Sequence, residues 1–274
     1  MIRNASLADV ERMLDWAAQE GWNPGLGDAQ AFLAADPQGF FVAEAGGEVA
    51  ACISVVNHSD SHAFLGFYIA QAAFRGQGIA FELWREAMKH AGDRTVGLDG
   101  VADQQENYAR SGFVRSGATL RLEGPRPEAE ADGIRAFTAR DMDAVAALDT
   151  QANGVARPRF LREWVKDTGS RRTLVLDDGR GVAGFATARL CRAGCKIGPV
   201  VAPDAAAALA LAAAAAGALR ASDVVIDVPD AQPGFVGILK RRGFAETFGT
   251  ARMYRGTPPA VSGRLFGIAT MELG

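Results

Sequence analysis

Residues 67–84 read FYIAQAAFRGQGIAFELW. The stretch begins as a strand, passes through a turn that contains Gly76 and Gly78, and ends in a helix that begins near residue 78. Free backbone N–H groups converge where a helix begins, the helix dipole adds to their field, and glycines let the main chain approach phosphate oxygens closely. Arg75 adds positive charge beside the turn. The stretch therefore predicts an anion site, with a glycine-rich structural turn as the alternative.

Two familiar phosphate motifs do not fit this turn. A dinucleotide fingerprint requires a third glycine where Phe81 stands, and it normally follows the first strand of its unit. The chain also contains no G-x-x-x-x-G-K-[ST] string, so a Walker A loop is excluded.

The sequence contains an internal repeat. IRNASLADV at 2–10 returns as IRAFTARDM at 134–142, and in each copy a hydroxyl residue precedes an acid by three positions, which is typical of a capped helix start. GFVRSGATLR at 112–121 likewise returns as GFAETFGTAR at 243–252. We therefore expect two homologous domains, at residues 1–122 and 133–274, joined by the Pro- and Glu-rich linker 123–132.

The first unit has a clear order of elements. The patterns predict helices at 6–19, 28–35, 78–91 and 103–111, and strands at 39–45, 49–56, 63–70, 95–99 and from Phe113 onward. Strands that are first paired as hairpins and then joined through helices indicate an α/β (α+β) fold with a mixed sheet covered by helices.

Composition narrows the function classes. A net charge of −3 and a pI near 5.7 provide no excess positive field for nucleic acid. The three cysteines lack the partners of a zinc site and are expected to be free thiols in a reducing cytoplasm. The alanine-rich stretch 205–219 spans about 22 Å, too short for a bilayer, and no signal peptide is expected at the N-terminus. We expect a cytoplasmic protein without membrane, nucleic-acid or metal partners.

The order Arg75-x-x-Gly78-x-Ala80 resembles the pyrophosphate loop of the GNAT superfamily of N-acetyltransferases. NYARSGF at 107–113 is similar to that family's helix with a tyrosine four residues before Gly-Phe. The resemblance covers residues 2 to about 122 in order and extends more weakly to the second unit. EGWNPGLGD, GLDGV and the closing FGIATMELG resemble a bacterial subgroup of tandem GNAT proteins. It implies two GNAT-like domains, each with a mixed, mostly antiparallel sheet flanked by helices.

The resemblance also implies a cofactor site for acetyl-CoA. Backbone groups of the strand before the loop would hold the pantetheine arm, and the loop would hold the phosphates. The residues it assigns to the cofactor are Tyr68, Ile69, Ala70, Phe74, Arg75, Gly76, Gln77, Gly78, Ile79, Ala80 and Asn107. The asparagine that many members place seven residues before the tyrosine is replaced by Val101.

Acetyl transfer requires a neutral amine and a proton for the departing thiolate. By the resemblance, Tyr108 would protonate the thiolate, since its ordinary pKa near 10 exceeds the ~8.5 of a thiol. The base is open: Asp99 and Tyr68 are candidates, His58 and His62 share a polar loop, and deprotonation through water is a further option.

Trp22 and Asn23, in the loop after the first helix, are expected to line the acceptor pocket. Arg189, Lys196 and Asp227 of the second unit are further possible lining residues.

The second copy lacks the cofactor signals of the first. Its counterpart of the loop reads APDAAAALA at 202–210, where Asp204 fills the helix N-cap with a negative charge. Leu239 stands where Tyr108 stands in the first copy. We therefore expect the second domain to be degenerate and to support the first domain or complete its acceptor pocket.

These expectations favour an acetyl-CoA-dependent N-acetyltransferase that moves an acetyl group directly to a small primary amine in the N-terminal domain. The alternatives are a non-catalytic CoA-binding sensor and a protein-lysine acetyltransferase. The protein is expected to be a monomer or a homodimer.

Overall fold

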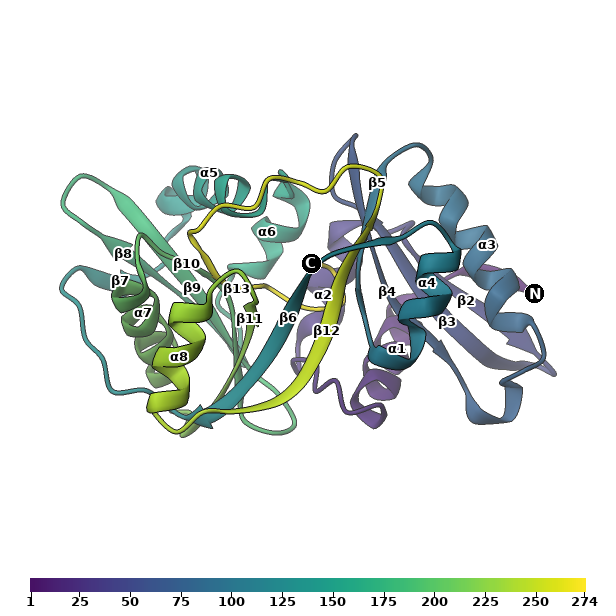
Figure 1. The fold of residues 1–274 in the computed structure, drawn as a ribbon, viewed down its shortest axis with the longest axis horizontal. Helices are drawn as coiled ribbons and strands as arrows, with labels where there is room; N and C mark the ends of the chain where they lie inside the picture. The colour runs from purple at the N-terminus through teal and green to yellow at the C-terminus, as the bar shows by residue number, and fades with distance from the viewer.

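One continuous sheet runs through both halves of the protein (Figure 1). The computed structural model describes all residues from 1 to 274. The sheet has thirteen strands in the order β1-β2-β3-β4-β5-β12-β6-β11-β10-β9-β8-β7, and β13 pairs with β10 outside that path. Only two neighbouring pairs, β4 with β5 and β10 with β11, are parallel, so the sheet is mixed and mostly antiparallel as predicted.

The first unit contributes β1 (Ile2–Asn4), α1 (Leu7–Gln19), α2 (Asp28–Ala35), β2 (Phe40–Ala45), β3 (Glu48–Asn57), β4 (His62–Ala70), η1 (Ala72–Phe74), α3 (Ile79–Ala91), β5 (Thr95–Gly100), η2 (Ala102–Gln104), α4 (Gln105–Arg110) and β6 (Val114–Pro125). The second contributes β7 (Ile134–Ala136), η3 (Ala139–Asp141), α5 (Met142–Asn153), α6 (Pro158–Trp164), β8 (Arg171–Asp177), β9 (Val182–Leu190), β10 (Cys195–Val201), α7 (Ala205–Ala218), β11 (Asp223–Pro229), α8 (Pro233–Arg241), β12 (Ala245–Arg255) and β13 (Leu265–Gly267).

Local signals in the sequence act where they were expected. Ser6 caps α1 in a reciprocal capping box with Asp9, and Thr138 forms the same motif with Asp141 in the second unit.

The three cysteines are buried and unpaired. Helix α7 is covered on most of its surface by the core of the second unit, and no helix in the protein has the length and apolar character that a membrane crossing requires.

The last strand of each unit lies in the sheet of the other unit. β12 pairs with β5 of the first unit, and β6 pairs with β11 of the second, while β6 and β12 pair with each other in the middle of the molecule (Figure 1). Strand β6 also includes residues 123–125, which the sequence assigned to the linker. The repeat predicted two similar units but not this exchange of strands.

Two matching ion pairs fasten the exchanged strands. In one, Arg121 of β6 donates from Nε to Asp227 Oδ1 (2.8 Å) and from Nη2 to Oδ2 (3.1 Å). In the other, Arg252 of β12 donates from Nε to Asp99 Oδ1 (3.0 Å) and from Nη2 to Oδ2 (2.7 Å). Both carboxylates are buried, and a buried charge that loses its partner costs ~3–5 kcal/mol. The exchange is therefore tied to specific chemistry on both sides.

A second set of buried charges joins α2 to the sheet of the second unit. Asp28, which is fully buried, accepts hydrogen bonds from Arg171 (2.9 Å) and from Arg189. Both guanidinium groups also lie over the ring of Trp164, at 4.4 and 4.5 Å from its centroid. Trp164 in turn stacks on Phe32 of α2. Because these contacts cross between the units, the two units form one packed body.

The segment 265–274 threads through the middle of the molecule (Figure 1). It pairs with β10 at Val200 and Val201, and it passes so close to Gly198 that a Cβ there would overlap the carbonyl of Ile268. Further along the segment, the Glu272 carbonyl lies so close to Gly66 of β4 that a Cβ on Gly66 would overlap it as well. Gly66 and Gly198 occupy matching places in the two units, so one segment packs against both.

We expect Gly198→Ala to lower the free energy of unfolding by about 1–3 kcal/mol, because the added methyl forces the 265–274 segment away from β10. Urea denaturation measures the change. Gly234→Ala is the matched control, since a Cβ in that helix meets no atom within 4 Å and alanine favours the helix. Equal stability of the two variants would contradict the close packing of the segment.

Candidate active site

Strands β4 and β5 separate partway along their length. They pair in parallel from His62 and Thr95 to Leu65 and Leu98, after which both strands continue without pairing with each other. Phe67, just beyond the last pair, has φ +51°, a left-handed conformation that a bulky residue rarely adopts. The separation leaves the β5-facing edge of β4 unpaired over residues 68–70.

The turn after β4 presents a row of backbone N–H groups that are not hydrogen-bonded within the protein. The N–H groups of residues 76–81 have no hydrogen-bond acceptor within the protein, and helix α3 has no side-chain cap. Gly76 and Gly78 have φ values of +77° and +81°, and a Cβ on either would meet no atom within 4 Å. The glycines are thus required by backbone conformation and leave open space beside the donors. This geometry fits an anion such as pyrophosphate.

A groove of about 500 Å³ connects this turn to the separated strands. Of the predicted cofactor residues, the groove is lined by Tyr68, Ile69, Ala70, Phe74, Arg75, Gly76, Gly78 and Ala80. Gln77, Ile79 and Asn107 do not line it; Asn107 donates to the Gln104 side chain instead. The guanidinium of Arg75 is held at the groove by Glu20 (2.8 Å) and by the Ala70 carbonyl (2.9 Å).

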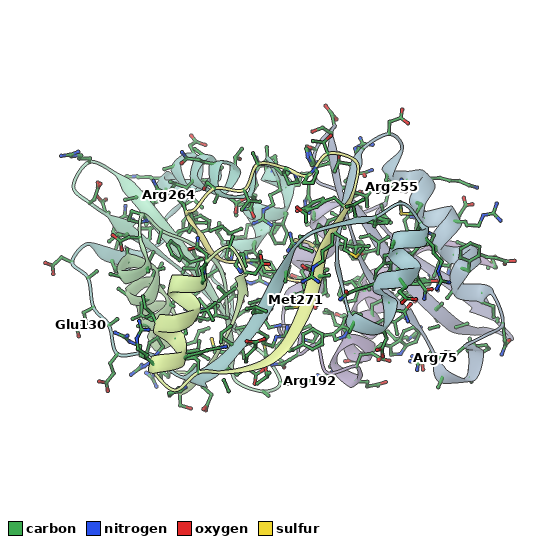
Figure 2. All side chains as sticks on the ribbon, in the orientation of Figure 1. Arg75, Glu130, Arg192, Arg255, Arg264 and Met271 are labelled. Atoms are coloured by element: carbon green, nitrogen blue, oxygen red, sulfur yellow. The ribbon has the colours of Figure 1, made fainter.

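A smaller cavity of about 60 Å³ adjoins the groove where β4 and β5 separate. Both units contribute its walls. The cavity and the groove share Trp22, Tyr68, Val101 and Gln104. The other lining residues are Leu65, Gly66, Phe67, Leu98, Asp99 and Tyr108 of the first unit and Phe248, Thr250, Met271 and Glu272 of the second. Figure 2 shows Met271 in the middle of the molecule, far from Arg75 at the outer side of the first unit.

Tyr108 lies in the wall of the smaller cavity. Its ring stacks on Trp84 (centroids 5.7 Å apart) and meets the edge of Phe113, so its orientation is determined by packing. Its hydroxyl has no hydrogen-bond partner within the protein. Burial, aided by the neighbouring Tyr68, raises the pKa of Tyr108 well above its ordinary value. The phenol therefore remains protonated at neutral pH and can donate.

Asp99 lines the same cavity, but its carboxylate is already occupied. Besides the two bonds from Arg252, Oδ1 accepts from Thr119 (3.2 Å) and Thr250 (3.1 Å). The equivalent pair, Arg121 with Asp227, is present in the second unit, which has no glycine loop. These contacts argue against the prediction that Asp99 is the base and give it a structural role.

The two residues predicted for the acceptor pocket have different positions. Trp22 lines the cavity, and its carbonyl accepts from Arg121 (3.0 Å) and Lys196 (3.1 Å). Asn23 does not line the cavity, because its side-chain amide donates to the Ala193 carbonyl (2.8 Å) across the interface between the units.

The remaining predicted side chains lie elsewhere. Arg189, Lys196 and Asp227 are buried in ion pairs and line neither space. His58 and His62 line a separate small cavity. Burial and the charge of Arg157 lower the pKa of His58 to about 4, and its ring bonds to the Leu273 carbonyl. The histidines are therefore not placed to act as the base.

Sequence reasoning missed the cavity residues of the second unit. Phe248 and Thr250 belong to β12, which reaches the cavity only through the strand exchange, and Met271 and Glu272 belong to the final segment. FGIATMELG was noticed only as a family resemblance. A signal was present in the acidic Glu272 within an otherwise apolar stretch, since a buried acid requires a reason.

The matching cofactor position in the second unit is closed. Asp204 caps α7, accepting from the Ala207 N–H (2.8 Å), so the negative charge lies where the first unit has free donors. Strand β13 pairs with β10 at Val200 and Val201, which match the open edge at Tyr68 and Ile69. Leu239 is buried in the core. The helix donors and the strand edge that stay free in the first unit are thus both occupied in the second.

Comparison with known proteins agrees with this arrangement. The model "Acetyltransferase (GNAT) family" matches residues 7–113, and "Acetyltransferase (GNAT) domain" matches residues 145–267. Holothin acyltransferase of Pseudoalteromonas sp. (strain SANK 73390) is 37% identical over 98% of this chain and 93% of its own length.

Two solved structures share the fold. A putative acetyltransferase from Pyrococcus horikoshii superposes with a TM-score of 0.83 at 22% identity, covering 100% of this chain and 95% of that one. A tandem GNAT protein from the clavulanic acid biosynthesis pathway superposes with a TM-score of 0.64 at 16% identity, covering 94% and 99%. With both halves matched and a relative similar along its length, this chain belongs to the GNAT acetyltransferase family and is a tandem GNAT acyltransferase.

Proposed function

We propose that the protein transfers an acetyl group from acetyl-CoA to a small primary amine in one direct step, with the chemistry in the first unit. The observation that carries the proposal is the continuous path from the free N–H groups of residues 76–81, along the open edge of β4, to the cavity that holds Tyr108. An anion site, an extended channel and a proton donor are thus arranged in the order in which acetyl-CoA presents its pyrophosphate, pantetheine arm and thioester.

The chain's own groups provide the requirements of the reaction. The backbone edge of β4 can meet the pantetheine amides, and an N–H at that edge can stabilise the oxyanion, a contribution of ~2.7–4 kcal/mol in comparable acyl transfers. The amine nitrogen bonds to the thioester carbon as the C–S bond breaks. The departing thiolate takes the proton of the Tyr108 hydroxyl, which the raised pKa keeps in place until that moment.

The acceptor side favours a small molecule over a protein lysine. The cavity is small, and Phe248 and Met271 of the second unit line it together with Trp22 of the first. The relative of 37% identity bears the name of an enzyme that acylates holothin, which supports acyl transfer to a small molecule here as well. A CoA-binding sensor would not need an unpartnered tyrosine hydroxyl beside the thioester position.

Gly78→Asp tests the anion site by giving the first unit the cap that Asp204 gives the second. We expect acetyl-CoA to bind at least tenfold more weakly, because a carboxylate now faces the phosphates, and the loss should shrink at high salt. Calorimetric titration with CoA measures it. Gly46→Asp, at another glycine of positive φ with open space around it, controls for backbone strain. Equal CoA affinity of the two variants would rule out the loop as the phosphate site.

Tyr108→Phe tests the proton donor. We expect kcat for acetylation to fall by about 10²–10⁴-fold with little change in CoA affinity, since the phenol acts on the thiolate. Thiol release with a panel of amines measures kcat. Tyr254→Phe is the control, a tyrosine that is also 7% exposed but lies outside this cavity. If no amine supports turnover by the parent while CoA still binds, transfer to a small amine is ruled out and the sensor alternative is favoured.

A further inference from the structure

Glu272 is the buried acid of the small cavity whose carboxylate is incompletely bonded. The residue is 3% exposed and lines the cavity together with Tyr108. Its Oε2 accepts from the Thr270 hydroxyl, whereas its Oε1 has no hydrogen-bond partner. No lysine, arginine or histidine nitrogen lies within ion-pair distance of it. An unsatisfied buried carboxylate oxygen is costly, and such atoms call for an explanation.

The position of Glu272 is determined on both sides. Its backbone N–H donates to Thr270 Oγ1 (3.1 Å), which folds residues 270–272 into a tight turn. Its carbonyl packs directly on Gly66, immediately after the last residue pair that joins β4 to β5. Glu272 thus lies at the fork of the two strands, beside the proposed position of the thioester.

We propose that Glu272 binds the protonated acceptor amine and removes its proton before acetyl transfer. This inference rests on the proposed function and deepens it by naming the residue that receives the acceptor. It also fits an acceptor that presents a primary ammonium group, since the free Oε1 requires a hydrogen-bond donor. The second unit would then contribute a catalytic residue to the site of the first.

The proton balance of the step is complete. An alkylamine resembles lysine, with a pKa near 10.4, so roughly one molecule in two thousand is neutral at pH 7. The ammonium gives one proton to Glu272, and the neutral nitrogen then bonds to the thioester carbon as the C–S bond breaks. Tyr108 gives its proton to the thiolate and regains one from the new amide nitrogen. The products are the amide, the CoA thiol and one proton that Glu272 releases to solvent.

The charges around Glu272 suit this role. Burial raises its pKa above the ordinary value, and the positive charges of Lys196, Arg189 and Arg121 on the neighbouring strands oppose that shift without cancelling it. On the cavity side, the titratable groups are Asp99, paired with Arg252, and the phenols Tyr68 and Tyr108. A carboxylate with a raised pKa is a stronger base, and its activity is lost as the pH falls through that pKa.

The test compares Glu272→Gln with the parent on two acceptors of one shape. One is a primary alkylamine that the parent acetylates, and the other is its fluorinated analogue, weakly basic enough to be neutral at pH 7. We expect kcat/KM for the alkylamine to fall by about 10²–10⁴-fold, with the acidic limb of its pH profile lost. The fluorinated amine should lose less than tenfold, and the KM for acetyl-CoA should not change.

Glu246→Gln is the control, because that glutamate lies on β12 outside the cavity and pairs with Lys240 at the surface. Should Glu272→Gln fail to fold, Glu272→Asp is the second variant, because it keeps the carboxylate but moves it away from the acceptor by one methylene. We expect it to retain the acidic limb of the pH profile with a lower kcat/KM. An unchanged pH profile, or equal losses on both amines, would overturn the role of Glu272. A parent that acetylates no amine would instead overturn the proposed function, so the two failures are distinguishable.

Discussion

The exchange of β6 and β12 between the two units is the constraint on which the rest of the structure depends. Each strand completes a sheet to which it does not belong by sequence, and each is fastened there by a bidentate arginine–aspartate pair, Arg121 with Asp227 and Arg252 with Asp99. Because both pairs are buried, neither strand can leave without uncovering an unpaired charge. The exchange brings Phe248 and Thr250 of β12 to the wall of the small cavity.

The two units have the same free strand edge, but it is open in the first unit and occupied in the second. In each, a parallel strand pair ends at a glycine, Gly66 or Gly198, and leaves a strand edge free of its parallel neighbour. In the second unit β13 occupies that edge, and Asp204 satisfies the helix donors beyond it. In the first unit the edge and the donors remain free. The difference between an open groove and a filled one thus depends on one short strand and one carboxylate.

Much of the fold could be predicted from the sequence because its signals are local. The Ser6 and Thr138 caps, the glycine turns and the apolar periodicity each act within a few residues, and the elements of the first unit begin and end close to the predicted positions. The groove residues around Gly76 and Gly78 could be predicted from the sequence for the same reason.

What the sequence did not indicate depends on contacts between distant segments. No local pattern distinguishes a final strand that pairs with its own unit from one that pairs with the other. Asp99 was a candidate base because it lies near the end of the strand beside the predicted cofactor strand, and only its bonds to Arg252, Thr119 and Thr250 show that its carboxylate is occupied. Glu272 is about 200 residues distant in sequence from Tyr68, with which it lines the small cavity.

Because residues 265–274 reach the small cavity, the two units build different parts of the cavity and groove, and this separation bears on how such enzymes diversify. The groove that we propose for the donor is built by the first unit, whereas part of the wall of the small cavity is carried by β12 and by this closing segment. If the second unit holds no cofactor, as we propose, its residues are released from the demands of that chemistry. Substitutions in the second unit can then reshape the small cavity while the groove of the first unit stays constant, so new specificity can arise in the copy that lacks the glycine loop.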